Sequence, residues 1–190
     1  DSIGKYPHAK SAVSQADYER TPLYGLNQLL SFISPFSDEF MYEIKFLKTY
    51  LNIYLKNSLR LDPRKDNWIY DGIQVYAMMK YIEEHHPESK MLGSASNIGL
   101  LKSYNLTNLD FNEQYSYFYM LMARKNLDQP LGSSKTALIK FNEQIASKYR
   151  AGLSIRFLDQ YLQNNAVTTS IRQFYALNMV KQTSRTDFET

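Results

Sequence analysis

Few side chains in this sequence can bind a metal ion or act as a nucleophile. The chain has three histidines and no cysteine, which excludes thiolate metal sites, cysteine nucleophiles and disulfides. His85 and His86 are adjacent, and adjacent residues cannot share one face of a helix. They follow Glu83 and Glu84, so we interpret them as the solvated end of a helix, where a positive charge is favourable. His8 is predicted to lie in an N-terminal loop.

A more specific pattern joins Lys48, Asn52 and Asp71. Lys48 and Asn52 are four residues apart in a segment with helical spacing, so they lie on one face of a helix. Eighteen residues separate Asn52 from Asp71, which belongs to the block Asp66–Tyr76, DNWIYDGIQVY. Zinc is held by imidazole, thiolate or carboxylate groups, so an ammonium, an amide and a single carboxylate do not make a zinc site.

The block Asp66–Tyr76 resembles the W-L-x-E-G-x-A-x-Y helix of the gluzincin (thermolysin-like) aminopeptidases. In that family the Glu of this helix is the third zinc ligand, and the first two ligands are the histidines of an upstream H-E-x-x-H motif. The resemblance places Lys48 and Asn52 at the two histidines, Thr49 at the catalytic Glu and Asp71 at the third ligand. Thr49 cannot act as the general base of a zinc peptidase. The resemblance therefore implies a peptidase-like chain without catalytic residues, metal or cofactor.

Two further landmarks follow the same family order. Tyr149–Gly152 resembles the Y-x-K-G step, whose Tyr stabilises an oxyanion, with Ala151 in place of the Lys; the residues fit equally well a helix that ends at Tyr149 and a break at Gly152. Tyr24–Gln28 lies where the family has its G-x-M-E-N strand, but it lacks the Glu that binds a substrate amine. The residues that we expect to line a binding groove are Tyr24, Gln28, Trp68 and Tyr149.

A pocket shaped around a dication would leave Asp71 unpaired once the zinc is lost. We expect the ammonium group of Lys48 to replace that charge by contacting Asp71, and to donate to Asn52 as well. The alternative is that Lys48 and Asp71 both point into solvent and never meet, as surface charges commonly do.

Composition narrows the class of protein. The chain has 190 residues, of which 44% are hydrophobic, enough for one domain with a core. Its net charge is +3 and its pI about 8.9, with both signs interspersed, so we expect no nucleic-acid partner. No run of apolar residues is long enough to span a membrane, and no signal peptide is visible. Because the chain begins at Asp1, we expect that an upstream segment was removed.

The sequence predicts a mainly α fold, a helical gluzincin-like half-domain with a short extended or β N-terminal segment. Residues 1–37 are predicted to be loop with short strands, 38–182 a helical peptidase-like domain and 183–190 a frayed polar tail. The predicted helices are Asp38–Leu59, Trp68–His85, Met91–Tyr104, Asn112–Leu127, Ser134–Tyr149, Gly152–Asn164 and Thr168–Lys181. The first two should be antiparallel neighbours, because the break between them is short.

Three functions stay open. The leading hypothesis is a non-catalytic domain that binds peptide or protein in a vestigial active-site groove. The second is an active metallopeptidase, an aminopeptidase whose active site is completed outside this chain. The third is a structural helical module of a larger envelope protein, with an exposed apolar patch around residues 1–35. The resemblance hints at a bacterial protein in an extracytoplasmic or cell-envelope compartment.

Overall fold

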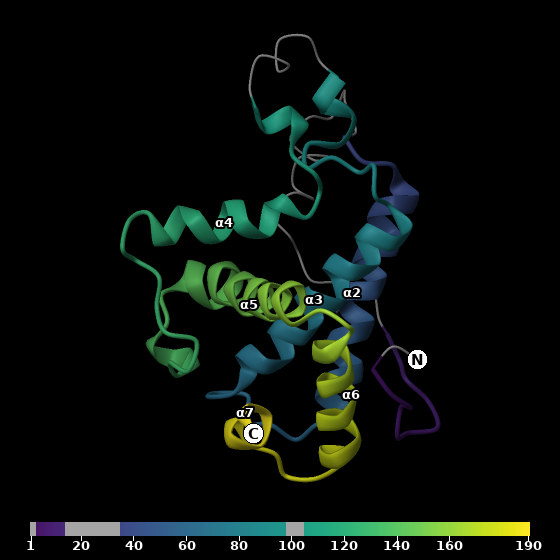
Figure 1. The fold of residues 1–190 in the computed structure, drawn as a ribbon, viewed down its shortest axis with the longest axis vertical. Helices are drawn as coiled ribbons and strands as arrows, with labels where there is room; N and C mark the ends of the chain where they lie inside the picture. The colour runs from purple at the N-terminus through teal and green to yellow at the C-terminus, as the bar shows by residue number, and fades with distance from the viewer. Residues whose placement is uncertain (1–2, 14–34, 98–104) are drawn as a thin grey trace. The chain divides into compact units, whose positions relative to one another are not determined.

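The chain folds mainly into α-helices in the computed structural model, which describes residues 3–13, 35–97 and 105–190 (Figure 1). Its elements in chain order are α2 (Asp38–Ser58), α3 (Asn67–His85), η3 (Gly93–Asn97), η4 (Asn105–Asn108), α4 (Glu113–Ala123), η5 (Lys135–Ala137), η6 (Asn142–Ala146), α5 (Ser147–Leu162), α6 (Ala166–Asn178) and α7 (Arg185–Glu189). Within those ranges, extended pairing is limited to the isolated bridges Arg60–Gln182 and Lys90–Asp110. The mainly α prediction is confirmed.

The residues pack as two compact units. Unit 1 comprises residues 1–12, 51–77 and 115–190, and unit 2 comprises residues 13–50 and 78–114. Both α2 and α3 run through the two units, so each unit receives one half of each helix. Each unit is described below by itself.

Contacts inside each unit show that α2 and α3 are antiparallel neighbours. In unit 2, Glu43 in the first half of α2 accepts hydrogen bonds from Tyr81 and His86 at the end of α3. In unit 1, the hydroxyl of Tyr70, near the start of α3, donates to the carbonyl of Leu59 at 2.6 Å and accepts from the Leu61 amide at 2.9 Å. The predicted pairing is therefore confirmed.

Both helix starts and ends follow local chemistry. The Ser37 hydroxyl accepts the Phe40 amide at 3.2 Å, as an N-cap does, and α2 begins at Asp38 as predicted. The predicted bounds of α2 and α3 differ from the observed ones by one residue at most. Residues 3–13 are irregular chain, as expected for a loop, and form no strand.

In unit 1, α3 and α5 cross at two glycines. A Cβ atom on Gly152 would lie 2.3 Å from Val75 Cγ1, and one on Gly72 would lie 3.1 Å from Ala151 Cβ. At Gly152 only a residue without a side chain allows the two helices to lie this close. Gly152 is inside the continuous helix α5, so the predicted break at Gly152 is wrong. The predicted helix Ser134–Tyr149 is also wrong in its first half, where η5 and the π-helical turn η6 lead into α5.

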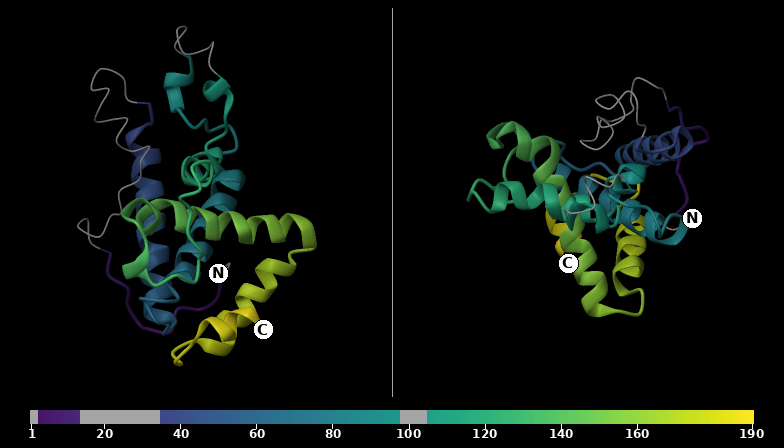
Figure 2. Two further views of the ribbon diagram at one scale, coloured as in Figure 1. Left: turned by 90° about the vertical axis from the view of Figure 1, so that its left-hand side faces the viewer. Right: turned by 90° about the horizontal axis from the view of Figure 1, so that it is seen from above.

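The C-terminal residues are ordered against α6. Ser184 and Asp187 form a capping box that starts α7, and the Phe188 ring lies 5.0 Å from the Phe174 ring of α6. Figure 2 shows α7, in yellow, beside α6. The predicted frayed tail is therefore wrong, because the local cap and an aromatic contact hold these residues.

The predicted helix Met91–Tyr104 is wrong in its first part, where η3 is a short 3₁₀ turn in unit 2. Gly93 has a φ of +53°, and a Cβ on it would lie 2.0 Å from the Pro35 carbonyl oxygen. That carbonyl accepts the Ser94 amide at 2.7 Å, which ties the turn to the residues before α2. The rest of the predicted helix, residues 98–104, lies outside the described residues.

Candidate functional site

Asp71 is a buried carboxylate in the first turns of α3. Its side chain is 8% exposed, and the amide of Asn67, one helical turn earlier, donates to Asp71 Oδ2 at 2.5 Å. Lys148 on α5 places its ammonium nitrogen 3.6 Å from Asp71 Oδ1. Because burial of an unpaired carboxylate is costly, an amide and an ammonium group on the two oxygens stabilise the folded chain at this position.

Lys148 is the cation that sequence reasoning missed at this position. Lys148 directly precedes Tyr149 on α5. Because α5 packs against α3, the Lys148 ammonium group lies beside Asp71. Lys48 and the buried Thr49 belong to unit 2, and the half-buried Asn52 belongs to unit 1. The contact of Lys48 with Asp71 stays a prediction.

Tyr149 lies in the core of unit 1. It is 4% exposed, and its ring meets the Tyr115 ring edge-on at 4.8 Å and the Phe118 ring at 6.5 Å. Burial also raises the pKa of Tyr115. In this position the ring of Tyr149 contributes to packing between α4 and α5.

The residues that the resemblance aligns with zinc ligands do not fit the ion. An ammonium group faces the Asp71 carboxylate, and an amide donor contacts its other oxygen. Within the described ranges, no group of three or more His, Cys, Asp or Glu side chains could hold a metal ion. Zinc needs a set of such ligands, and Asp71 alone does not supply one.

Trp68 opens on a cavity of about 560 Å³ within unit 1. The cavity is lined by Trp68, Pro130, Leu131, Gly132, Ser133, Arg150, Arg185 and Glu189. The Trp68 ring packs edge-on against the Phe188 ring of α7 at 5.7 Å. Its indole nitrogen is buried without a hydrogen-bond partner among the described residues. Trp68 therefore lines open space and also has a buried N–H donor without a described partner. Tyr24 and Gln28, the other predicted groove residues, lie outside the described residues.

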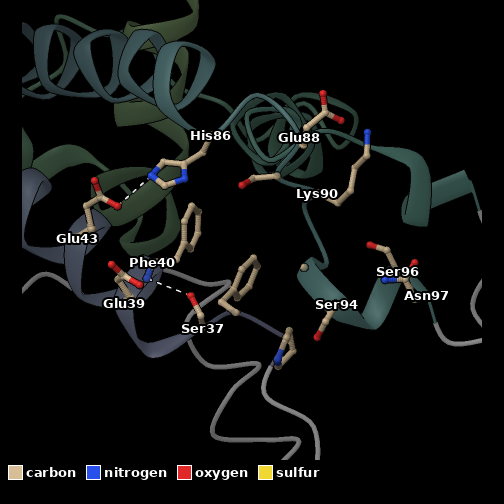
Figure 3. A pocket seen from close by; sticks show the side chains of 14 residues that line it. Ser37, Glu39, Phe40, Glu43, His86, Glu88, Lys90, Ser94, Ser96 and Asn97 are labelled. Carbon is tan, nitrogen blue, oxygen red and sulfur yellow. Dashed lines mark hydrogen bonds and ion pairs between the residues drawn. The ribbon is translucent and has the colours of Figure 1, made fainter.

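Unit 2 has a second cavity, of about 590 Å³, that sequence reasoning did not predict (Figure 3). Phe40, Glu43 and Ser37 come to it from α2 and the residue before it, His86 from the end of α3, and Ser94, Ser96 and Asn97 from η3. The buried rings of Phe36 and Phe40 stack at 5.7 Å, and both meet Phe111 edge-on.

Glu43 fixes the imidazole of His86 at this second cavity. The two side chains meet at 2.9 Å through His86 Nε2, and Figure 3 shows the imidazole reaching toward Glu43 above Phe40. The hydroxyl of Tyr81 donates to the other carboxylate oxygen. This bond, followed by the contact with His86, lowers the pKa of Glu43, and the Glu43 carboxylate raises the pKa of Tyr81 to about 12.

The structure corrects the interpretation of the two histidines as one solvated helix end. His85 is exposed and stacks on Tyr81 at 4.3 Å, whereas His86 is half-buried and paired with Glu43. The signal that could have found this pair is the acidic residue Glu43 near the start of α2, since the antiparallel helix α3 ends at His85, directly before His86.

Compared with protein-family models, with curated proteins and with solved structures, the chain gives no match. Helices in the described residues do not combine the length and the hydrophobicity that crossing a bilayer requires. The candidate sites therefore rest on their own geometry.

Proposed function

We propose that this chain is a non-catalytic, peptidase-like domain of the gluzincin aminopeptidase type that binds peptide. The observation that carries the proposal is the contact between its two landmark motifs. Gly72, in the block that resembles the zinc-ligand helix, packs on Ala151 in the step that resembles Y-x-K-G, and Lys148 pairs with Asp71 beside them. Motifs whose side chains act on one substrate have to lie close together, and this contact meets that requirement.

The charge at the third-ligand position supports the non-catalytic part of the proposal. A peptidase of this type needs a dication and a general base beside the substrate carbonyl. Here an ammonium group contacts the carboxylate at that position, and threonine stands at the position of the base. The pair of Asp71 and Lys148 supplies structure in place of catalysis.

The Trp68 cavity supports the peptide-binding part. It combines an aromatic wall, two apolar residues, Pro130 and Leu131, and hydrogen-bonding groups, which is the composition of sites that take small organic ligands. Trp68 also belongs to the motif block itself, one residue after Asn67, the partner of Asp71.

Zinc titration and a hydrolysis assay test the non-catalytic part together. We expect no stoichiometric submicromolar binding of zinc by calorimetry, and no release of fluorophore from aminoacyl-fluorophore substrates. Hydrolysis that a chelator abolishes would instead support the alternative of an active aminopeptidase. Asp71→Asn is the matched variant, since a zinc site that used Asp71 would lose affinity with it.

Peptide binding is tested with the fluorescence of Trp68, the only tryptophan in the chain. We expect short peptides to change its emission saturably. A mixture of short peptides that leaves both its emission and a calorimetric baseline unchanged would contradict the peptide-binding part.

The alternative of a structural module has one observation in its favour. The last turns of α5 expose large apolar side chains, with Phe157 at 67% and Tyr161 at 75% of their surface. Their rings stack at 6.5 Å, and Leu158 and Leu162 beside them are about half exposed. Contiguous exposed apolar surface is typical of protein contacts. Self-association that Phe157→Ser abolishes, measured by light scattering, would support this alternative.

A further inference from the structure

Three of the side chains that line the cavity at Trp68 have N–H donors, namely Trp68, Arg150 and Arg185. The buried Trp68 indole N–H has no acceptor among the described residues, and burying a donor without a partner is unfavourable. Two guanidinium groups, those of Arg150 and Arg185, line the same space, and Glu189 is the only acidic residue among the described residues that line it. Two positive groups and one negative group give these lining residues a net charge of +1.

The Arg150 guanidinium is held in place with donors to spare. Its Nη1 donates to Asp128 Oδ2 at 3.1 Å and to the Gln129 carbonyl at 3.2 Å, and its carbon lies 5.8 Å from the centre of the Tyr119 ring. A guanidinium group has five N–H donors. Within the part of the chain that the structure describes, its Nε and Nη2 have no acceptor.

The Arg185 guanidinium lies over the Pro130–Ser133 loop. Its Nε donates to Glu189 Oε1 at 2.5 Å, which leaves its terminal nitrogens without an acceptor in the described residues. A Cβ atom on Gly132 would lie 2.6 Å from Arg185 Nη1, so the glycine lets this group lie close to the loop. The pairing with Glu189 orients the guanidinium while its outer edge stays available.

We propose that this cavity binds a carboxylate group, supplied by the C-terminus or by an acidic side chain of a bound peptide. A carboxylate has only acceptors, and it matches the fork of a guanidinium group with two parallel hydrogen bonds. The indole of Trp68 is a third lining group with an N–H donor, and Pro130 and Leu131 offer apolar contact to the adjoining side chain. The peptide in this inference rests on the proposed function, whereas the carboxylate rests on the cavity alone.

The indole N–H signal of Trp68 tests the site directly, because a chain with one tryptophan gives one such signal in a proton–nitrogen correlation spectrum. The probe is N-acetyl-L-leucine, and its matched control is N-acetyl-L-leucinamide, which has the same shape without the charge. We expect a saturable downfield shift with the acid, and at least about tenfold weaker binding of the amide. No shift with the acid, or equal affinities, would overturn the proposal.

Variants of the two arginines localise the effect. Arg185→Gln and Arg150→Gln should each weaken the acid about tenfold, since each removes a charge-assisted donor. Arg124→Gln, an exposed arginine of unit 1 that does not line the cavity, should leave the affinity unchanged. Should a Gln variant fail to fold, Arg185→Lys is used in its place. The fall in affinity of the acid between low and high salt then measures the contribution of charge. Unchanged affinity in folded variants, or equal loss with Arg124→Gln, counts against the site.

Peptide pairs separate the two sources of the carboxylate and the two proposals. A free-acid peptide that binds more tightly than its amide identifies the C-terminus, and an amidated peptide that binds only when it contains Glu identifies a side chain. Binding of N-acetyl-leucine without binding of any peptide would sink the proposed function and leave the carboxylate site standing. Peptide binding of the same affinity in both arginine variants would contradict the carboxylate site and leave the proposed function standing. Binding of inorganic phosphate without binding of any carboxylate probe would overturn the carboxylate assignment.

Discussion

Asp71 in unit 1 and Glu43 in unit 2 are two carboxylates with different surroundings. Asp71 is 8% exposed and has an amide and an ammonium group on its oxygens. Glu43 is 36% exposed, has a phenol and an imidazole on its oxygens, and lines a cavity. Side chains of unit 1 enclose the Asp71 carboxylate, whereas the Glu43 carboxylate lies at a cavity that is open to solvent.

The difference lies in the partners and in the burial. Lys148 and Asn67 contact the two oxygens of the buried Asp71, so this carboxylate has an environment that suits a structural role. Glu43 is paired with a half-buried imidazole and a phenol beside a cavity, so its surroundings are more open than those of Asp71. The buried pair of Asp71 and Lys148 therefore belongs to the scaffold of unit 1, whereas the pair of Glu43 and His86 lies at an open surface of unit 2.

The largest effect is expected at the helix crossing that builds the Asp71 centre. Gly152→Ala puts a Cβ atom 2.3 Å from Val75 Cγ1, so α3 and α5 must move apart. We expect this overpacking to lower the free energy of unfolding by about 3 kcal/mol, which urea denaturation measures. Gly132→Ala is the control, because its Cβ would meet only the flexible end of Arg185, and it should cost less than about 0.5 kcal/mol. Equal losses in the two variants would mean that the close approach does not matter.

The next effect separates Lys148 from Lys48 as the partner of Asp71. Lys148→Met removes the ammonium group from a buried carboxylate, and it should cost roughly 1–2 kcal/mol, less than the loss of a fully buried pair because Lys148 is 20% exposed. Asp71→Asn should restore most of this loss, which a double-mutant cycle measures. The same cycle with Lys48→Met tests the predicted contact of Lys48. A coupling energy near zero for Lys148 and Asp71 would sink the pair.

The fold was predictable where local signals decide it. Ser37, the acidic first turn and Pro87 set α2 and α3, whose bounds the sequence predicted to within a residue. Gly152 was misread because a glycine in a sequence signals a break, while its role here, close approach to Val75, exists only once two helices have packed. The order of the C-terminal residues likewise depends on Phe174 meeting Phe188.

The candidate site was predictable only in part, for the same reason. Trp68 and Asp71 were identified by their motif, because both lie in one contiguous block. Lys148 and the pair of Glu43 with His86 were not, since their partners lie on other helices and no spacing along the chain records those contacts.

The smallest effect concerns the acid limb of stability at Glu43. Hydrogen bonds from Tyr81 and His86 lower its pKa below the ordinary value of 4.5, so the unfolded chain takes up its proton at a higher pH than the folded chain does. This contribution is present above pH 4.5 and is lost as the pH falls through the folded-state pKa. Glu43→Gln should therefore flatten the loss of unfolding free energy on acidification by about 0.5 kcal/mol, a small value because solvent screens the exposed group.

Urea denaturation from about pH 6 to pH 3 measures the change, with Glu84→Gln as the control. Glu84 is an exposed acid of α3 outside the second cavity, so its variant should follow the wild-type curve. Parallel curves for the wild type and Glu43→Gln would show that His86 and Tyr81 do not favour the ionised carboxylate. Glu43 would then resemble an ordinary surface acid, and the contrast with Asp71 would reduce to burial alone.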